Sequence, residues 1–102
     1  MKVYGYCRIS TSKQSMERQI RNIKLAYPDA VIVKETYTGT IIQGRKEFEK
    51  LLKIVSTDDT LVFDSVSRMS RTAQEGYEMY QKLYNQGVSL VFLKEPHIPI
   101  FL

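Results

Sequence analysis

An arginine and a serine close to the N-terminus are the first residues in this sequence whose types could do chemistry together. Arg8 and Ser10 stand within VYGYCRISTS, residues 3–12. The start of this segment favours extended, buried backbone, and after Ser15 the apolar residues recur with the period of a helix. Both side chains are therefore expected at the carboxyl edge of a sheet, where open α/β folds bind ligands. A nearby helix N-terminus would favour an anion, so we hypothesise that Ser10 is a nucleophile aimed at a phosphate.

Further arginines could complete a phosphate site around this serine. Arg68 and Arg71 would share one face of a helical turn near the same sheet edge, and Arg45 could reach that edge from the loop before its helix. Arginine is always charged, and its planar fork matches two phosphate oxygens. Converging guanidinium groups would stabilise the charge of a phosphoryl-transfer transition state. The alternative is that these are ordinary solvated arginines and that Ser10 is a turn serine.

Other chemistries fit this sequence less well. The single histidine, His97, stands beside a proline near the C-terminus, and no serine lies in a G-x-S-x-G elbow. No glycine-rich phosphate loop is present. The sequence lacks clustered carboxylates, histidines or cysteines, so neither a metal nor another cofactor is expected. The lone cysteine, Cys7, is expected to be a buried structural residue.

The composition is that of one small globular domain. The chain has 102 residues, of which 43% are hydrophobic and 25% charged. The formal net charge of +4 is compatible with a polyanionic partner. No apolar run could span a bilayer, no signal peptide is evident, and a single cysteine argues against a disulfide scaffold, so the cytoplasm is the expected compartment.

Apolar periodicity alternates between strand and helix along the chain. Successive strand–helix–strand units predict an α/β fold with a mostly parallel sheet of four or five strands and helices on its faces. Residues 35–44 show no clear period and are expected to form a functional loop. Strands are expected over residues 3–7, 30–34, 61–63 and 88–93, and helices over residues 16–27, 45–55 and 72–85.

Local signals add detail to two of these helices. Ser15 is the expected N-cap of the first helix, and Thr72 with Glu75 has the form of a capping box for the third. Tyr77, Tyr80 and Tyr84 follow helical spacing in that third helix. They are expected in the core or at a subunit interface rather than as stacking platforms for bases.

Several segments resemble the serine recombinases, the resolvase and invertase family. YCRIST at residues 6–11 is similar to the Y-x-R-V-S-T of that family, and RMSR at residues 68–71 is similar to its R-L-S/G-R motif. Gln19 stands in the first helix where the family has its glutamine. YTGT at 37–40 resembles the flexible loop, and GRKEF at 44–48 resembles the next helix start. These matches occur in order along nearly the whole chain, and they imply a three-layer α/β/α resolvase-like catalytic domain.

The resemblance implies an activity and a set of site residues. Ser10 would attack a phosphodiester of double-stranded DNA and become linked to the 5′ phosphate, while the 3′ hydroxyl leaves. Neither a metal nor ATP is implied, and full-length members act as homodimers and synaptic tetramers. The implied catalytic residues are Ser10, Arg8, Arg45, Arg68, Arg71 and Gln19. The implied DNA-binding residues are Arg8, Arg45, Arg68, Arg71, Ser12 and Lys13.

The chain departs from the family pattern in two respects. Ser67 stands where the family usually has an aspartate, and Asp64 is close but not at the matching position. A serine can exchange hydrogen bonds but cannot hold a charge, so proton handling is expected to involve solvent or to be slower. Residues 1–102 would also form a catalytic domain without the long dimer helix and the C-terminal DNA-binding domain. Weak DNA binding with little sequence choice is then expected.

Two other classes of function stay open. A recombinase remnant could act as an interaction module for DNA or for another recombinase subunit, and Ser67 favours that alternative. A small enzyme or nucleotide binder on a flavodoxin-like fold would also use phosphate, but the missing glycine-rich loop counts against it.

Overall fold

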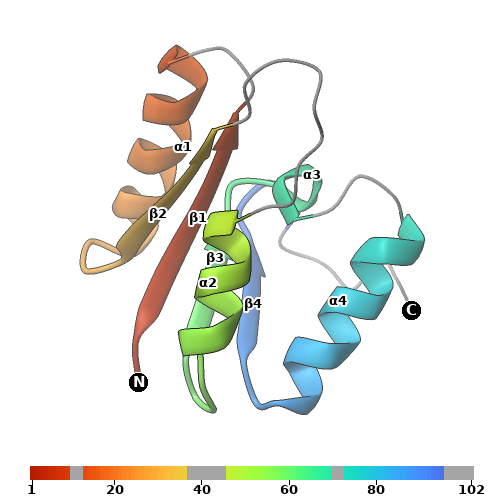
Figure 1. Cartoon of the computed structure of the whole chain (residues 1–102). Coiled ribbons are helices and arrows are strands. Elements are labelled where there is room, and N and C mark those ends of the chain that lie inside the picture. The colour runs from red at the N-terminus through yellow and green to blue at the C-terminus, as the bar shows by residue number, and fades with distance from the viewer. Residues whose placement is uncertain (10–12, 37–45, 70–72, 96–102) are drawn as a thin grey trace.

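Four parallel strands form one sheet in the computed structural model, which describes residues 1–9, 13–36, 46–69 and 73–95 (Figure 1). The strand order is β2-β1-β3-β4, with every neighbouring pair parallel. This confirms the α/β fold with a parallel sheet that the sequence predicted. The strands are β1 (Val3–Ile9), β2 (Val31–Thr36), β3 (Thr60–Phe63) and β4 (Ser89–Phe92).

Helices cover both faces of this sheet (Figure 1). Side chains of α1 pack with one set of inward strand residues, and side chains of α2 and α4 pack with the other set. We call these the α1 face and the α2/α4 face. The helices are α1 (Lys13–Ala26), α2 (Lys46–Ile54), α3 (Val66–Met69) and α4 (Ala73–Asn85).

Two local predictions near the N-terminus were wrong. The first helix begins at Lys13, so Ser15 lies inside it and is not its N-cap. The first strand continues to Ile9, because its pairing with β2 extends as far as Ile9 opposite Thr36. Arg8 is therefore part of the strand rather than of the loop that follows.

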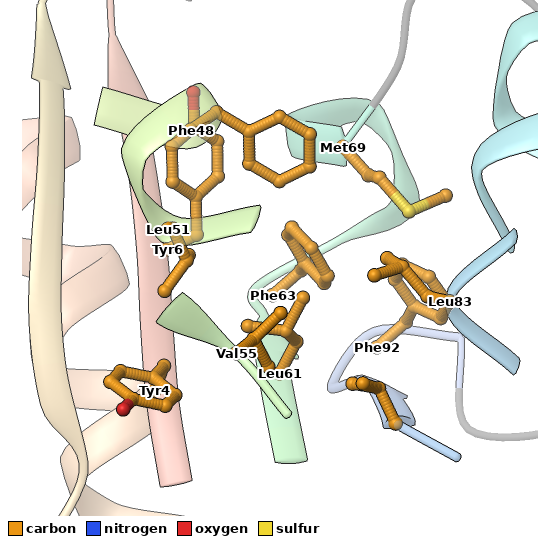
Figure 2. Packing of buried hydrophobic residues seen from close by; sticks show 11 residues of the cluster. Tyr4, Tyr6, Phe48, Leu51, Val55, Leu61, Phe63, Met69, Leu83 and Phe92 are labelled. Carbon is orange, nitrogen blue, oxygen red and sulfur yellow. The ribbon is translucent and has the colours of Figure 1, made fainter. Parts of the chain in front are cut away.

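The α2/α4 face is packed by aromatic side chains (Figure 2). Phe63 lies in the middle of the cluster, with Tyr6 and Phe48 on one side and Phe92 on the other. The ring centroids of Tyr6 and Phe48 are 4.8 Å apart, and those of Phe63 and Phe92 are 5.3 Å apart. Rings of this size bury large apolar areas and dominate the energetics of a small core.

The α1 face holds a smaller cluster whose buried members include no aromatic ring, although the partly buried Tyr27 packs against it. Its buried members are Cys7, Ile9, Met16, Ile23, Ala30 and Val62. Gly5 allows α1 to approach β1 closely, since a Cβ atom added at this glycine would lie 2.8 Å from the Cγ2 of Ile23. The prediction that Cys7 is a buried cysteine is confirmed.

The tyrosines of α4 do not form the core that their spacing suggested. Tyr77 is 38% exposed and Tyr84 is 66% exposed, and Tyr80 stacks on Tyr84 with ring centroids 6.2 Å apart. The core alternative was therefore wrong for Tyr77 and Tyr84, because α4 turns Leu83 toward Phe63 and Phe92 instead, and the alternative of a subunit interface stays a prediction. No helix in the described part of the chain combines the length and the apolar character that a bilayer crossing requires.

Candidate active site

Arg8 and Arg68 lie against each other at the carboxyl edge of the sheet. The Nη2 atom of Arg8 donates a hydrogen bond of 2.6 Å to the carbonyl oxygen of Ser67. In return, the Nη1 atom of Arg68 donates one of 3.2 Å to the carbonyl oxygen of Arg8. The prediction that these two arginines meet near the same edge is confirmed by these two hydrogen bonds, which tie the end of β1 to α3.

Gln19 holds the backbone of Arg8 from the α1 side. Its side chain is only 1% exposed, and its Oε1 accepts the Arg8 N–H at 3.1 Å. Its Nε2 donates to the Arg8 carbonyl oxygen at 3.2 Å and lies 3.3 Å from the Oγ of Ser15. The side-chain amide of Gln19 therefore satisfies both backbone polar groups of the arginine.

The end of the β1–β3 pairing explains why a glutamine is needed there. The register of β1 with β3 stops at Tyr6 opposite Phe63, whereas β1 pairs with β2 as far as Ile9. Beyond Tyr6, the strand edge that faced β3 has lost its neighbour. A buried backbone group without a partner is costly, so Gln19 replaces the missing strand at Arg8.

The remaining predicted site residues lie outside the described part of the structure. Ser10, Ser12, Arg45 and Arg71 fall in the gaps between the described ranges. Lys13 is the first residue of α1, and only its backbone is described. Their roles therefore stay predictions.

Ser67 occupies the position at which the resemblance led us to expect an aspartate. It is exposed in α3, and its Oγ lies 2.8 Å from the Oγ of Ser65. Asp64 is 2% exposed and accepts a hydrogen bond of 3.0 Å from Asn22. Lys94 also reaches Asp64, with 3.4 Å between Nζ and Oδ2. The carboxylate of Asp64 is therefore buried and bound on the α1 face.

Glu35 is a buried carboxylate that sequence reasoning missed. It is 6% exposed at the end of β2, and its Oε1 accepts hydrogen bonds of 3.0 Å from the Tyr6 hydroxyl and the Phe48 N–H. Its Oε2 accepts the Glu47 N–H at 3.2 Å. Glu35 thus caps the first turn of α2, whose backbone donors would otherwise lack partners. The signal in the sequence that could have revealed this role is an acidic residue directly after the apolar run AVIVK, residues 30–34.

The thiol of Cys7, the residue before Arg8, is expected to be unreactive. Burial, with the negative charge of Asp64 adding to it, raises the pKa of Cys7 to about 12. The thiolate is the nucleophilic form of cysteine, so a pKa this high leaves Cys7 protonated at neutral pH. Across the described ranges, no three His, Cys, Asp or Glu side chains come together in a way that could hold a metal ion.

Comparison with known proteins assigns the chain to a family. The sequence model described as "Resolvase, N terminal domain" matches residues 3–100, so the chain belongs to that family. It is 32% identical over 93 residues to the transposon Tn21 resolvase of Escherichia coli and 33% identical over the same length to the transposon Tn501 resolvase of Pseudomonas aeruginosa. Each match covers 89% of this chain but 46% of the relative. The chain therefore spans about half the length of these curated relatives.

Solved structures agree with this assignment. A resolvase family site-specific recombinase from Streptococcus pneumoniae superposes with a TM-score of 0.69 and 29% identity, covering 94% of this chain and 74% of that one. The N-terminal catalytic domain of TP901-1 integrase superposes with a TM-score of 0.71 and 18% identity, covering 94% of this chain and 79% of that one. The expectation of a resolvase-like catalytic-domain fold is confirmed.

Proposed function

We propose that this chain is the catalytic domain of a serine-type site-specific DNA recombinase, with Ser10 as the nucleophile. The observation that carries the proposal is a pair of hydrogen bonds at this sheet edge, from the Arg8 guanidinium to the Ser67 carbonyl and from the Arg68 guanidinium to the Arg8 carbonyl. Arg8 lies two residues before Ser10 in the chain. Guanidinium groups fixed by backbone carbonyls at the end of β1 and in α3 suit a phosphodiester, because each planar fork matches two phosphate oxygens. The family membership and the resolvase relatives support the same reaction class.

The proposed step is a phosphoryl transfer to serine. A bond forms between the Ser10 Oγ and the phosphorus, and the bond from phosphorus to the 3′ oxygen breaks. The Ser10 hydroxyl loses its proton, and the departing 3′ oxygen gains one. The product is a 5′-phosphoserine linkage that conserves the bond energy, so a 3′ hydroxyl can reverse the step on another strand without ATP.

The described residues supply positioning and charge for this step. The guanidinium of Arg8 is oriented by the Ser67 carbonyl, and that of Arg68 by the Arg8 carbonyl. Positive groups fixed before the reaction stabilise a developing negative charge without reorganising. Gln19 acts one step away, because its amide fixes the backbone of Arg8. Arg45 and Arg71 are proposed to complete the phosphate site.

The proton of Ser10 is proposed to leave through solvent. Ser67 can relay a hydrogen bond but cannot take up the proton as a stable charge. Asp64 is bound to Asn22 and Lys94 on the α1 face. A slow cleavage step is the expected cost of this arrangement.

The proposed partner is double-stranded DNA, contacted through the four arginines and through Ser12 and Lys13. Recognition of a particular site, and assembly into dimers and tetramers, are assigned to parts of a full-length recombinase beyond the catalytic domain. We therefore expect the catalytic domain alone to bind DNA weakly and with little sequence choice, since base readout gives most of that choice.

A trapping assay tests the nucleophile directly. The chain, alone and fused to a foreign DNA-binding domain, is mixed with duplex that carries sulfur in place of the bridging 3′ oxygen. The released 3′ thiol rejoins poorly, so a covalent adduct should accumulate and can be mapped by denaturing gel and peptide mass spectrometry. We expect an adduct on Ser10 that is absent in Ser10→Ala and retained in Ser89→Ala, an exposed serine at the start of β4.

A negative result would favour the second candidate function. If the fusion bound the duplex but formed no adduct, the chain would be a recombinase remnant that serves as a DNA or subunit interaction module. The observation that favours this alternative is Ser67, which stands where the family usually has an aspartate.

A further inference from the structure

The end of β4 contacts the β3–α3 turn at successive residues. The N–H groups of Leu93 and Lys94 donate hydrogen bonds of 3.0 Å to the carbonyl oxygens of Phe63 and Asp64. The Lys94 Nζ lies 3.4 Å from the Oδ2 of the same Asp64. One residue further on, Glu95 accepts the Val66 N–H on its Oε1 at 2.9 Å. The residues that follow β4 therefore lie beside the end of β3 and reach the first residue of α3.

Helix α3 depends on such contacts because it is too short to be stable alone. It has four residues, Val66–Met69, and a helix of that length has hardly passed the unfavourable nucleation step. Its first backbone N–H groups have no partners inside the helix. Glu95 takes the first of them, and the Arg68 N–H donates to the Ser65 carbonyl at 3.1 Å. A carboxylate at a helix start is also electrostatically favourable.

The opposite end of α3 is held by the core. Met69 is fully buried in the cluster of the α2/α4 face, near Phe63 and Leu83 (Figure 2). Arg68 thus lies between two fixed points, the Glu95–Val66 hydrogen bond before it and the buried Met69 side chain after it. Its guanidinium reaches the Arg8 carbonyl from that position.

We infer that Glu95 is a positioning residue for Arg68. Its carboxylate fixes the start of α3, and through α3 it sets the place of the guanidinium beside Arg8. The inference rests on the proposed function, in which that guanidinium binds the reacting phosphate. Loss of the cap should shift α3 without opening the core, because Met69 still anchors the helix. A small displacement of a charged group at the reacting centre is enough to slow a phosphoryl transfer strongly.

Paired substitutions at this position test the inference in the trapping assay. Glu95→Ala removes the acceptor, whereas Glu95→Gln keeps an amide oxygen that can still accept the Val66 N–H. We expect Glu95→Ala to slow adduct formation about 10- to 100-fold at saturating DNA. We expect Glu95→Gln to stay within about threefold of wild type, because a neutral acceptor forms a weaker bond than a charged one but still satisfies the N–H. The DNA concentration for half-saturation should hardly change.

A second measurement reports on α3 without any chemistry. Amide hydrogen exchange at Val66 should be faster in Glu95→Ala, while exchange at Val62 in β3 stays as in wild type. Glu78→Ala is the matched control, since it removes an exposed carboxylate on α4 whose contact is with Gln74. This control should change neither the exchange at Val66 nor the rate of adduct formation.

The outcomes separate the inference from the proposed function. If the wild-type fusion forms no adduct, the proposed function fails, and a role for Glu95 in cleavage fails with it. If wild type forms the adduct and Glu95→Ala forms it equally fast, only the inference is overturned. The same holds if Val66 exchange rises but the adduct rate does not, because the cap would then serve stability alone.

Discussion

The two faces of the sheet are built from different kinds of residue. The α2/α4 face is closed by stacked and tilted aromatic rings around Phe63. The α1 face has a smaller aliphatic cluster, and near the carboxyl edge it turns polar, with Gln19, Asn22 and Asp64 bound to neighbouring groups. Ring packing dominates the α2/α4 face, where Glu35 adds hydrogen bonds with Tyr6 and Phe48, whereas on the α1 face side-chain hydrogen bonds hold the backbone of Arg8.

This division separates stability from site geometry in a very small domain. Apolar packing is non-directional and tolerates repacking, so it is suited to holding the fold together. Hydrogen bonds to a buried amide are directional, so they are suited to holding Arg8 in one place. Substitutions on the α2/α4 face should therefore change the free energy of unfolding most, and those on the α1 face should change the site most.

The largest expected effect is at the centre of the aromatic cluster. Phe63→Ala should lower the free energy of unfolding by about 3–5 kcal/mol, because it removes a fully buried ring and leaves a cavity. Val62→Ala, the neighbouring buried residue on the α1 face, should cost about 1.5 kcal/mol for two lost methyl groups. Urea unfolding of both variants measures the difference, and equal losses would contradict the division between the faces.

The second-largest effect is expected for substitution of Gln19, which should change both the free energy of unfolding and the rate of adduct formation. Gln19→Leu should cost about 1–3 kcal/mol, because the backbone N–H of Arg8 loses its buried partner. The rate of adduct formation should fall as well, since the backbone that carries the guanidinium is released. Gln19→Glu is the informative control, because it can accept the Arg8 N–H but has no N–H to donate to the Arg8 carbonyl. A Gln19→Leu variant that is destabilised but cleaves normally would contradict the positioning role.

Gly5 tests how closely the α1 face is packed. Gly5→Ala should lower the free energy of unfolding by about 1–3 kcal/mol, because the new methyl group would meet the Cγ2 of Ile23 at 2.8 Å and the Cδ1 of Ile32 at 3.0 Å. The same change made in an Ile23→Ala background should cost less, since the clashing methyl group is gone. A double-mutant cycle of urea unfolding gives the coupling between the two positions, and simple additivity would show that α1 moves away freely.

The smallest effect is expected at Asp59, which lies away from both faces at the amino edge of the sheet. Hydrogen bonds from the N–H groups of Ser56 and Lys2, both 2.9 Å long, hold the pKa of this carboxyl below its usual value of 3.8. A lowered folded-state pKa contributes stability above the unfolded-state value, and that stability is lost as the pH falls through the folded-state pKa. The stability advantage of wild type over Asp59→Asn should therefore shrink below about pH 4. Urea midpoints of both proteins at pH 6, 4 and 3 check this, and an advantage independent of pH would contradict it.

The sequence predicted the sheet, the long helices and the meeting of two arginines. Alternating periods of strand and helix require parallel strands, and residues at the ends of parallel strands share one edge. Arg8 and Arg68 could therefore be brought together without a structure. The family motifs placed Gln19 in the first helix, but not its bonds to the Arg8 backbone.

What the sequence could not predict are contacts between distant segments. Helix α3 is too short to show a period, and its cap comes from Glu95, well downstream in the chain. Glu35 caps α2 in the same way, from the end of β2. Ser15 was wrongly predicted as the N-cap of the first helix, because serine is a favoured capping residue but Ser15 lies inside the helix, two residues after its start at Lys13. Propensity reports on neighbours in sequence, whereas these caps depend on neighbours in space.

The burial of Cys7 makes the chain convenient for site-specific labelling. This thiol is the only one in the sequence, it has no exposed surface, and its pKa of about 12 keeps it in the form that does not react with maleimides. A cysteine introduced at an exposed position such as Leu25, which is 76% exposed, would then be the single reactive site. A fluorophore could be attached there without first removing the native cysteine, so that the approach of the domain to DNA can be followed by energy transfer.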